Sequence, residues 1–475
     1  MHQPPLQGHL HGEVGRFEFR NPDPGRTGVV IGVPHGTAEQ SAIEFAQTIR
    51  DGTGGGLVVA YDFKSKRIQV AQPLVHTSPV SWRAADSSRP GSVYPEYKNL
   101  LQSAALGPIK FYVGVRFTES ASPVPGIEVT ASGFSFKQLK ALKRIYAEIR
   151  NRRLKNLDAI AKIGLAINPL DDIGWNSYDV RNHGVLMLAE KGLILRLPKV
   201  LADPALNAVY REILTHWVQD VLTNTLDSAS NLQAVTFERM TYGRIDSILA
   251  RNSLPGVVIA APHGSFDWYT AELVEELSEI TSLPAVITRG FTPTECGGWR
   301  INVNRPTERR YPTDTIEHKT ERAREVYERF RDTVFRAAAG RLDTYIEMHQ
   351  NGSEANIEVA TLGISREEAI AIKSDYLEIR DRILQGMPDL IRVDLVIEPV
   401  DQVAIGAWAA KDHGMLRLSQ TSLHFELPAQ RLFYRNRTRR AYTRILSELI
   451  DRLVKSRRGS SEAKLISSPL PLTAD

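Results

Sequence analysis

Short apolar runs rich in β-branched residues alternate along the chain with longer segments of helical periodicity. Twice, such a run is followed by a polar loop, a predicted helix and a second apolar run. The first set is residues 29–33, 39–50 and 57–61, and the second set is residues 257–261, 269–280 and 285–288. Short continuous apolar runs are typical of strands buried on both faces of a sheet. Strands that alternate with helices predict an α/β fold with a mostly parallel sheet covered on both faces.

The same pattern continues toward the end of the chain. We expect strands at residues 344–348, 391–397, 415–418 and 423–427, and long helices at residues 320–338, 366–385 and 438–453. The segment DGTGGG at residues 51–56 lacks the Gly-Lys-Ser/Thr of a phosphate-binding loop, so we interpret it as a turn between a helix and a strand. Ligands of open α/β sheets bind beyond the carboxyl ends of the strands, and functional side chains are expected there.

Four segments of the first half recur in the second half in the same order. Two of them are short: GVVIGVPHGT becomes GVVIAAPHGS, and RIQV becomes RINV. Two are longer: residues 127–150 match residues 357–380 at 11 of 24 positions, and residues 183–198 match residues 413–428. The offset stays between 228 and 233 residues, which indicates a tandem duplication. We therefore predict domains at residues 1–228 and 229–475, joined by the polar, weakly patterned segment 222–235.

Composition narrows the classes of protein that fit this pattern. Hydrophobic residues make up 42% of the chain and charged residues 24%, as in an ordinary globular protein. A single cysteine, Cys296, excludes an internal disulfide and a cysteine-rich zinc site. The chain has no run of 18 apolar residues and no signal-like start, so we expect a cytoplasmic protein without a membrane span. The net charge of +4 is weak, and its basic clusters are interpreted as solvated helix faces rather than a nucleic-acid surface.

Differences between the two copies indicate where the chemistry lies. Each copy has a Pro-His-Gly loop after a strand with a carboxylate four residues past the histidine, giving His35 with Glu39 and His263 with Asp267. Such a pair is either an ordinary hydrogen-bonded pair or two of the three protein ligands of a catalytic zinc site. The third ligand is predicted at His349, which ends a strand of the second copy.

The first copy lacks two of these groups at the aligned positions. Arg116 stands where the second copy has His349, and Arg196 stands where it has Glu426. A cation beside a metal ion is repulsive, so we expect the first copy to be non-catalytic. Its histidine and glutamate are relics or bind something unidentified, and the copy buttresses or covers the active one. Glu426 either points to solvent from an edge strand or, as this coordinated difference favours, accepts a proton from water.

Residues 256–453 resemble the N-formylglutamate amidohydrolase family, whose fold is that of the zinc carboxypeptidases. Four family motifs occur in order. The Pro-His loop with its acid corresponds to Pro262-His263 and Asp267, and an Asp-Leu-Asn-Arg segment corresponds to RINVNRPTE from Arg300, with Asn302 in place of the Asp. A strand ending in Asp-x-His corresponds to Glu347-Met348-His349, and Gln-x-Glu followed by Leu-Tyr corresponds to His424-Phe425-Glu426 and QRLFY from Gln430.

This resemblance implies two tandem three-layer α/β/α domains with a mostly parallel mixed sheet. It also implies a hydrolase that cleaves an N-acyl or amide bond of a small carboxylate-bearing molecule. His263, Asp267 and His349 would hold one Zn²⁺ in the second copy, since two imidazoles and a carboxylate favour zinc over Mg²⁺ or Ca²⁺. Glu426 would act as general base, and Asn304 with Arg305 would bind a substrate carboxylate. Arg300, or else Arg289, is predicted to stabilise the oxyanion.

Several alternatives stay open from the sequence. The same site suits a metallopeptidase or a γ-glutamyl hydrolase, and a non-catalytic binding protein is a third interpretation. Glu295, in a glycine-rich loop that the first copy lacks, is a second candidate for substrate contact or for the place of Asp267. His424 is a candidate to support Glu426, which lies one strand step away on the same face. We expect no nucleic-acid or membrane partner, and the oligomeric state is left open.

Overall fold

The computed structural model describes most of the chain and divides it into two compact units. The described residues are 7–11, 15–37, 39–63, 70–73, 93–118, 126–174, 177–224, 234–249, 254–351, 355–428, 432 and 436–467. The first unit comprises Met1–Leu232 with Thr292–Trp299 and Arg310–Thr315, and the second comprises the remainder. The predicted boundary at residue 228 and most of the predicted linker lie outside the described residues, as do most of RIQV and of QRLFY.

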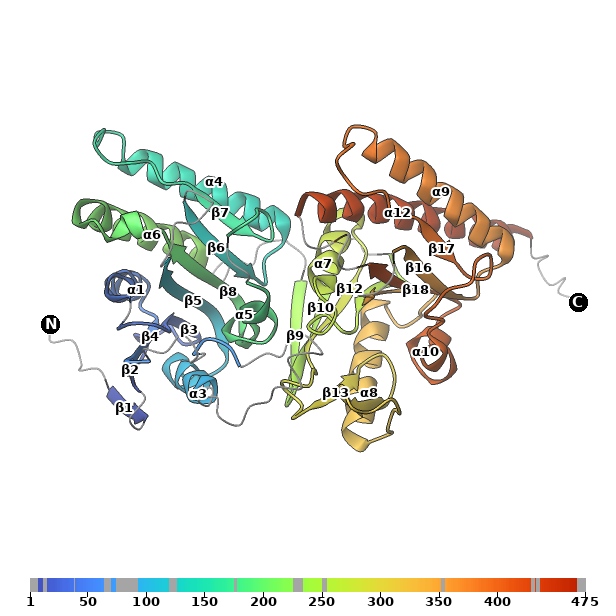
Figure 1. The fold of residues 1–475 in the computed structure, drawn as a ribbon, viewed down its shortest axis with the longest axis horizontal. Helices are drawn as coiled ribbons and strands as arrows, with labels where there is room; N and C mark the ends of the chain where they lie inside the picture. The colour runs from blue at the N-terminus through green and yellow to red at the C-terminus, as the bar shows by residue number, and fades with distance from the viewer. Residues whose placement is uncertain are drawn as a thin grey trace, which may run out of the picture. The chain divides into compact units, whose positions relative to one another are not determined.

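The first unit contains an eight-stranded mixed sheet, and helices cover both faces of this sheet (Figure 1). Its strand order is β1-β2-β4-β3-β5-β8-β6-β7. The bounds are β1 (Gln7–His11), β2 (Gly15–Arg20), β3 (Val29–Val33), β4 (Gly56–Tyr61), β5 (Ile109–Phe117), β6 (Ile127–Ser132), β7 (Leu165–Asn168) and β8 (Ala189–Leu197). One face packs against α1 (Gln40–Thr53), α4 (Phe136–Arg153) and α6 (Pro204–Leu222), and the other against α3 (Tyr94–Ala105) and α5 (Tyr178–Asn182). Neighbouring strand residues alternate between these two cores, as the pleat requires.

The second unit contains a sheet with the same strand order and the same strand directions. That order is β9-β10-β12-β11-β15-β18-β16-β17. The bounds are β9 (Ala234–Met240), β10 (Gly243–Leu249), β11 (Val257–Ala261), β12 (Ala285–Gly290), β15 (Thr344–Asn351), β16 (Ile357–Leu362), β17 (Leu395–Ile397) and β18 (Thr421–Pro428). Helices α7 (Thr270–Thr281), α9 (Arg366–Leu384) and α12 (Asn436–Ser467) share one core, and α8 (Glu321–Ala337) covers the other face (Figure 1).

These observations confirm the predicted α/β class with large mixed sheets. The predicted central strands and long helices are present, and Gly54, at a φ of 71°, ends α1 two residues before β4, as expected of a turn. Two predictions were wrong. Residues 415–418 form a 3₁₀ helix, η4 (Met415–Leu418), because Met415 and Leu416 are buried by one tight turn rather than by sheet pairing. The predicted strand 391–397 shortens to β17.

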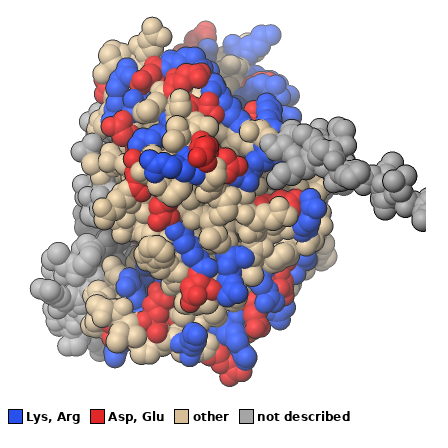
Figure 2. Space-filling view, turned by 90° about the vertical axis from the view of Figure 1, so that its right-hand side faces the viewer, with Lys and Arg blue, Asp and Glu red and all other residues tan. Residues whose placement is uncertain are grey.

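Other elements were not predicted from the sequence. They include the antiparallel edge strands of each sheet and a hairpin of β13 (Trp299–Asn302) and β14 (Thr307–Arg310). Among the described residues, none of the helices is both long enough and apolar enough to cross a bilayer. On the face of the molecule in Figure 2, basic and acidic side chains are interspersed. Several basic residues of α12 are paired with acids, such as Arg452 with Asp375 and Glu378.

One buried tyrosine in each unit ties a loop to the helix layer. In the second unit the Tyr442 hydroxyl accepts the N–H of Val393 at 2.6 Å and donates to the carbonyl of Ile391 at 2.7 Å. Tyr210 makes the same two contacts with Ile163 and Ala161, at 2.6 and 2.7 Å. Both rings are buried, so each hydroxyl satisfies a backbone N–H that has little access to water.

We predict that Tyr442→Phe destabilises the second unit by about 1–3 kcal/mol, because the buried N–H of Val393 loses its acceptor. Hydrogen exchange followed by mass spectrometry should show faster exchange at residues 390–397. Tyr210→Phe is the matched variant, and it should loosen residues 160–167 instead. Unchanged exchange at both loops would contradict the prediction.

Candidate metal centre

His263 and Asp267 lie on the tight loop that joins β11 to α7, at the carboxyl end of a central strand. The loop closes on itself, because the N–H of Asp267 donates to the carbonyl of His263 at 2.7 Å. It also needs a glycine at 264, where a Cβ would lie 2.6 Å from the carbonyl oxygen of Thr288. Strand β15 pairs in parallel with β11 and carries His349 toward the same edge. Sheet topology therefore brings residues that are far apart in sequence to one place.

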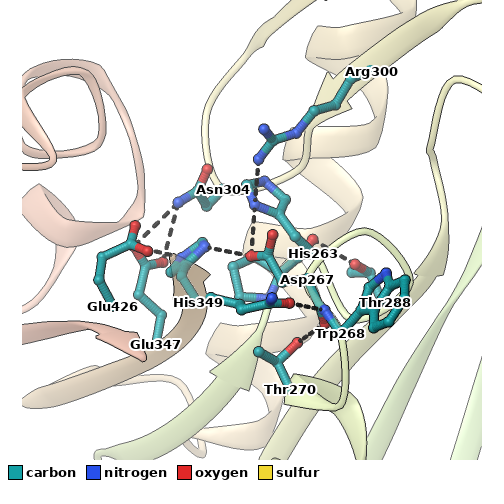
Figure 3. Close-up of polar contacts among 12 residues, drawn as sticks. His263, Asp267, Trp268, Thr270, Thr288, Arg300, Asn304, Glu347, His349 and Glu426 are labelled. Carbon is teal, nitrogen blue, oxygen red and sulfur yellow. Dashed lines mark hydrogen bonds and ion pairs between the residues drawn. The ribbon is translucent and has the colours of Figure 1, made fainter. Parts of the chain in front are cut away.

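The three predicted metal ligands converge (Figure 3). Oδ2 of Asp267 lies 3.0 Å from Nδ1 of His349 and 3.4 Å from Nδ1 of His263. All three side chains are buried, and one donor atom of each lies within 4.8 Å of the others. Tetrahedral zinc with bonds of about 2.0–2.1 Å places its ligand atoms about 3.3 Å apart. The donor set and its spacing therefore fit Zn²⁺.

The ring nitrogens of the two histidines are arranged for binding a metal ion through Nδ1. Both Nδ1 atoms face Asp267, while Nε2 of His349 lies 3.4 Å from Oε1 of Glu347. A metal ion bound at Nδ1 would hold both rings in place and fix their tautomers.

The ionisation of the cluster is set by burial and by Arg300. Burial and the guanidinium of Arg300 lower the pKa of His263 to about 3, which keeps its imidazole neutral. Burial disfavours a charge on His349 as well, but hydrogen bonds with Asp267 and Glu347 raise its pKa to about 10. The two imidazoles hold the pKa of Asp267 below its usual range although burial opposes this. Zinc binding at pH 7 must therefore displace a proton from His349.

Arg300 contacts the nitrogen that faces Asp267. Its Nη2 lies 2.8 Å from Nδ1 of His263, and its guanidinium stacks over the ring of Phe266 at 4.1 Å. Burial lowers the pKa of Arg300 to about 10, which still leaves it charged at pH 7. Because Nδ1 has a single lone pair, a metal ion at that atom excludes the contact with Arg300. Metal binding would thus release guanidinium N–H groups beside the metal.

Glu426 is connected to the cluster by a chain of contacts that runs through His424 and Glu347. Nε2 of His424 is 2.9 Å from Oε1 of Glu426, and Nδ1 of His424 is 2.5 Å from Oε1 of Glu347. Asn304 donates to both oxygens of Glu347, at 3.1 and 3.3 Å. Glu347 was not predicted as a site residue, although its spacing of two residues from His349 places both on one strand face.

The predicted carboxylate-binding pair is occupied by carboxylates of the chain itself. Nε of Arg305 donates to Glu317 at 2.9 and 3.2 Å, and its Nη2 also contacts Glu317. Oε2 of Glu317 also accepts from the hydroxyl of Thr307 at 2.7 Å. Although burial opposes ionisation, Arg305 lowers the pKa of Glu317 to about 2. The structure therefore shows the bidentate geometry expected of Arg305, with Glu317 rather than a substrate as the anion.

Two other predictions need correction. Arg289 of β12 is buried and pairs with Asp246 at 3.2 Å and with Glu275 at 2.6 Å. Its charge is therefore compensated by carboxylates of β10 and α7. This removes the basis for an oxyanion role. Glu295 belongs to the first unit, where its carboxylate contacts His183 at 2.7 Å and the N–H of Thr292 at 3.1 Å. Asp267, and not Glu295, is the acid of the histidine cluster.

The aligned positions of the first unit are used differently. Oε2 of Glu39 accepts the backbone N–H of Phe117 at 2.7 Å. Arg116 and Arg196 are paired positions of β5 and β8, and Arg196 forms an ion pair with Glu128 at 2.9 Å. In the described part of the chain, the groups of His, Asp and Glu suited to a metal ion all lie in the second unit.

Comparisons with known proteins found similarity at the level of solved structures. No protein-family model matches the chain, and neither does a curated protein. A bacteriophage poly-γ-glutamate hydrolase is similar over 46% of this chain and 93% of its own, with 12% identity and a TM-score of 0.27. A metallo-carboxypeptidase from Burkholderia cenocepacia is similar over 50% of this chain and 69% of its own, with 12% identity and a TM-score of 0.30. Thrombin-activatable fibrinolysis inhibitor is similar over 50% and 73%, with 10% identity and a TM-score of 0.30.

We predict that the chain binds one Zn²⁺ and that His349→Ala loses it. Removing one of three protein ligands leaves too few donors for tight binding, so affinity should fall at least about 100-fold. Elemental analysis of dialysed protein measures the zinc content. His35→Ala, which removes the first-unit histidine aligned with His263, is the control and should keep one zinc per chain. A full complement of zinc in His349→Ala would refute the assignment.

Proposed function

We propose that the second unit is a zinc-dependent hydrolase that cleaves an N-acyl or amide bond of a small, carboxylate-bearing substrate. The convergence of His263, Asp267 and His349 at the donor spacing of tetrahedral zinc carries the proposal. It is supported by Glu426, whose backbone position pairs with that of His349 across β15 and β18. The N-acyl substrate class follows from the resemblance of residues 256–453 to the N-formylglutamate amidohydrolases.

Glu426 and Arg300 have different roles in the proposed reaction. When bound, zinc supplies Lewis-acid activation of water and of the scissile carbonyl. Glu426 accepts one proton as the water oxygen bonds to the carbonyl carbon. The same carboxyl group then delivers that proton to the amine nitrogen as the C–N bond breaks, so the products are a carboxylic acid and an amine. Arg300, released from His263, donates N–H groups to the negative oxygen that develops at the carbonyl.

Arg305 is proposed to bind the substrate carboxylate, with Asn304 beside it. Nη1 of Arg305 donates to Oδ1 of Asn304 at 3.1 Å, which aligns the guanidinium. The bidentate contact with Glu317 supports this role, because the guanidinium already pairs with a carboxylate. A substrate carboxylate would take the place of Glu317, whose side chain is about a quarter exposed.

We further propose that the chain is a tandem duplication in which the first unit is not catalytic. The two sheets share one strand order, and the tyrosine contacts described above recur in both. At the paired strand positions occupied by His349 and Glu426, the first unit has Arg116 and Arg196. Two guanidinium groups supply neither a metal ligand nor a base.

We predict that Glu426→Gln lowers kcat about 10²–10⁴-fold while zinc content is unchanged, since the amide cannot take the proton from water. Amine release from N-formyl- and N-acetyl-glutamate and from related N-acyl amino acids measures the loss. Glu276→Gln is the control, because that half-buried carboxylate of α7 contacts Thr443 on α12 rather than the histidine cluster. Zinc-loaded Glu426→Gln with wild-type turnover would exclude the proposed mechanism.

We predict that Glu317→Gln lowers KM for carboxylate-bearing substrates on the order of fivefold. The substitution removes an ion pair of about 1 kcal/mol that competes with the substrate for Arg305. Arg305→Met should raise KM for the same substrates. The carboxamide analogue of each substrate is the control, and its KM should respond to neither change. Equal responses of acid and amide would show that Arg305 serves only the fold.

A further inference from the structure

We propose that Glu347 and His424 are positioning residues, which hold the metal ligand His349 and the base Glu426 in one fixed arrangement. The inference rests on the proposed function, and it assigns roles to two side chains that the function by itself leaves unexplained. Its basis is the pairing of β15 with β18. Glu347 pairs with His424, and His349 pairs with Glu426, in a parallel register. Residues two apart on a strand share a face, so the four side chains form a square on one face of the sheet.

The contacts along the sides of this square form a continuous path. Nε2 of His349 faces Oε1 of Glu347 at 3.4 Å, and the same oxygen contacts Nδ1 of His424 at 2.5 Å. Nε2 of His424 then contacts Oε1 of Glu426 at 2.9 Å. The rings of His349 and His424 stack at 4.3 Å with an interplanar angle of 26°. Each member is thereby held by its neighbours as well as by its strand.

The spacing distinguishes a positioning role from a second metal site. Glu347, His349 and His424 each offer a donor atom within 4.8 Å of the others, as metal ligands do. However, two ligands of one zinc ion lie about 3.3 Å apart. The 2.5 Å contact between Glu347 and His424 is much shorter than that and is a hydrogen bond. The group therefore supports a metal site and does not form one.

Glu347 is suited to orient His349. It is fully buried, and its carboxylate accepts hydrogen bonds from Asn304 and His424, so it is fixed in place. A histidine that binds a metal through one nitrogen usually donates its other N–H to a carboxylate, and loss of that carboxylate weakens metal binding about 10–100-fold. Nδ1 of His349 faces Asp267, which leaves Nε2 to face Glu347.

His424 holds the base rather than the metal. Its imidazole lies between two carboxylates, so the position of the Glu426 carboxylate is set by Glu347 through one ring. Without the ring, the Glu426 carboxylate loses this contact and with it a fixed orientation. We therefore expect loss of His424 to affect the rate of the chemical step and to leave zinc binding intact.

The test separates zinc affinity from turnover. Glu347→Gln should weaken zinc binding about 10–100-fold, as measured by competition with a chromogenic chelator, and should shift the visible spectrum of the Co²⁺-substituted protein. His424→Leu should bind zinc within about threefold of wild type and lower kcat at least tenfold with KM unchanged. His424→Gln, whose amide can donate to Glu426, should recover part of the lost kcat. Glu276→Gln and His216→Gln, which change a helix carboxylate and an exposed histidine, are the matched controls.

The outcomes separate this inference from the proposed function. Wild-type zinc affinity in Glu347→Gln together with wild-type kcat in His424→Leu overturns the inference, while zinc binding by the wild type and inactivity of Glu426→Gln still uphold the function. A wild type that binds no zinc overturns both. Equal losses in His424→Leu and His424→Gln assign His424 a packing role only and overturn its half of the inference. If Glu347→Gln does not fold, the two His424 variants decide the matter by the same criteria.

Discussion

The parallel pairing of β15 with β11 on one side and β18 on the other is the constraint on which the candidate site depends. Backbone hydrogen bonds fix the register, so His349 meets both the β11–α7 loop and Glu426 at one edge of the sheet. A slip of one residue would turn every side chain of β15 to the opposite face. The buried apolar residues of that strand, Tyr345, Ile346 and Met348, prevent such a slip. The register of β15 therefore sets both the packing of the core and the geometry of the site.

Charge balance in a buried place is the second constraint. Asp267 and Glu347 are buried carboxylates, and each is surrounded by imidazoles that compensate its charge. Arg300 adds a further, partly buried cation beside His263. A divalent ion bound here would add two positive charges, and a proton displaced from His349 would offset part of that addition.

The candidate site was predictable from the sequence by comparing the two halves, through a loop motif that they share and two positions at which they differ. His349 and Glu426 were predicted because the other half has arginines at their positions, and His263 and Asp267 because both halves keep a histidine and an acid in the loop after a strand; the structure brings these four to one edge. The roles of Arg305 and Arg289 were harder to predict, because the role of a guanidinium depends on the carboxylate with which it pairs. Their partners, Glu317 and Glu275, lie on other elements. The edge strands β9 and β10 were not predicted because polar residues, such as Glu238 and Asp246, interrupt their apolar runs. The turn at Met415–Leu418 buries two apolar neighbours without the ladder that their pattern suggested.

The contact between Arg305 and Glu317 has a consequence for how such a site responds to supply. An anion that belongs to the chain competes at an effective concentration that dilution cannot lower, and for short connections this reaches the millimolar range. If Arg305 binds a substrate carboxylate as proposed, this carboxylate must displace Glu317 before it reaches the guanidinium. The tethered competitor then raises the substrate concentration at which the site saturates, and turnover stays proportional to substrate over a wider range of concentrations.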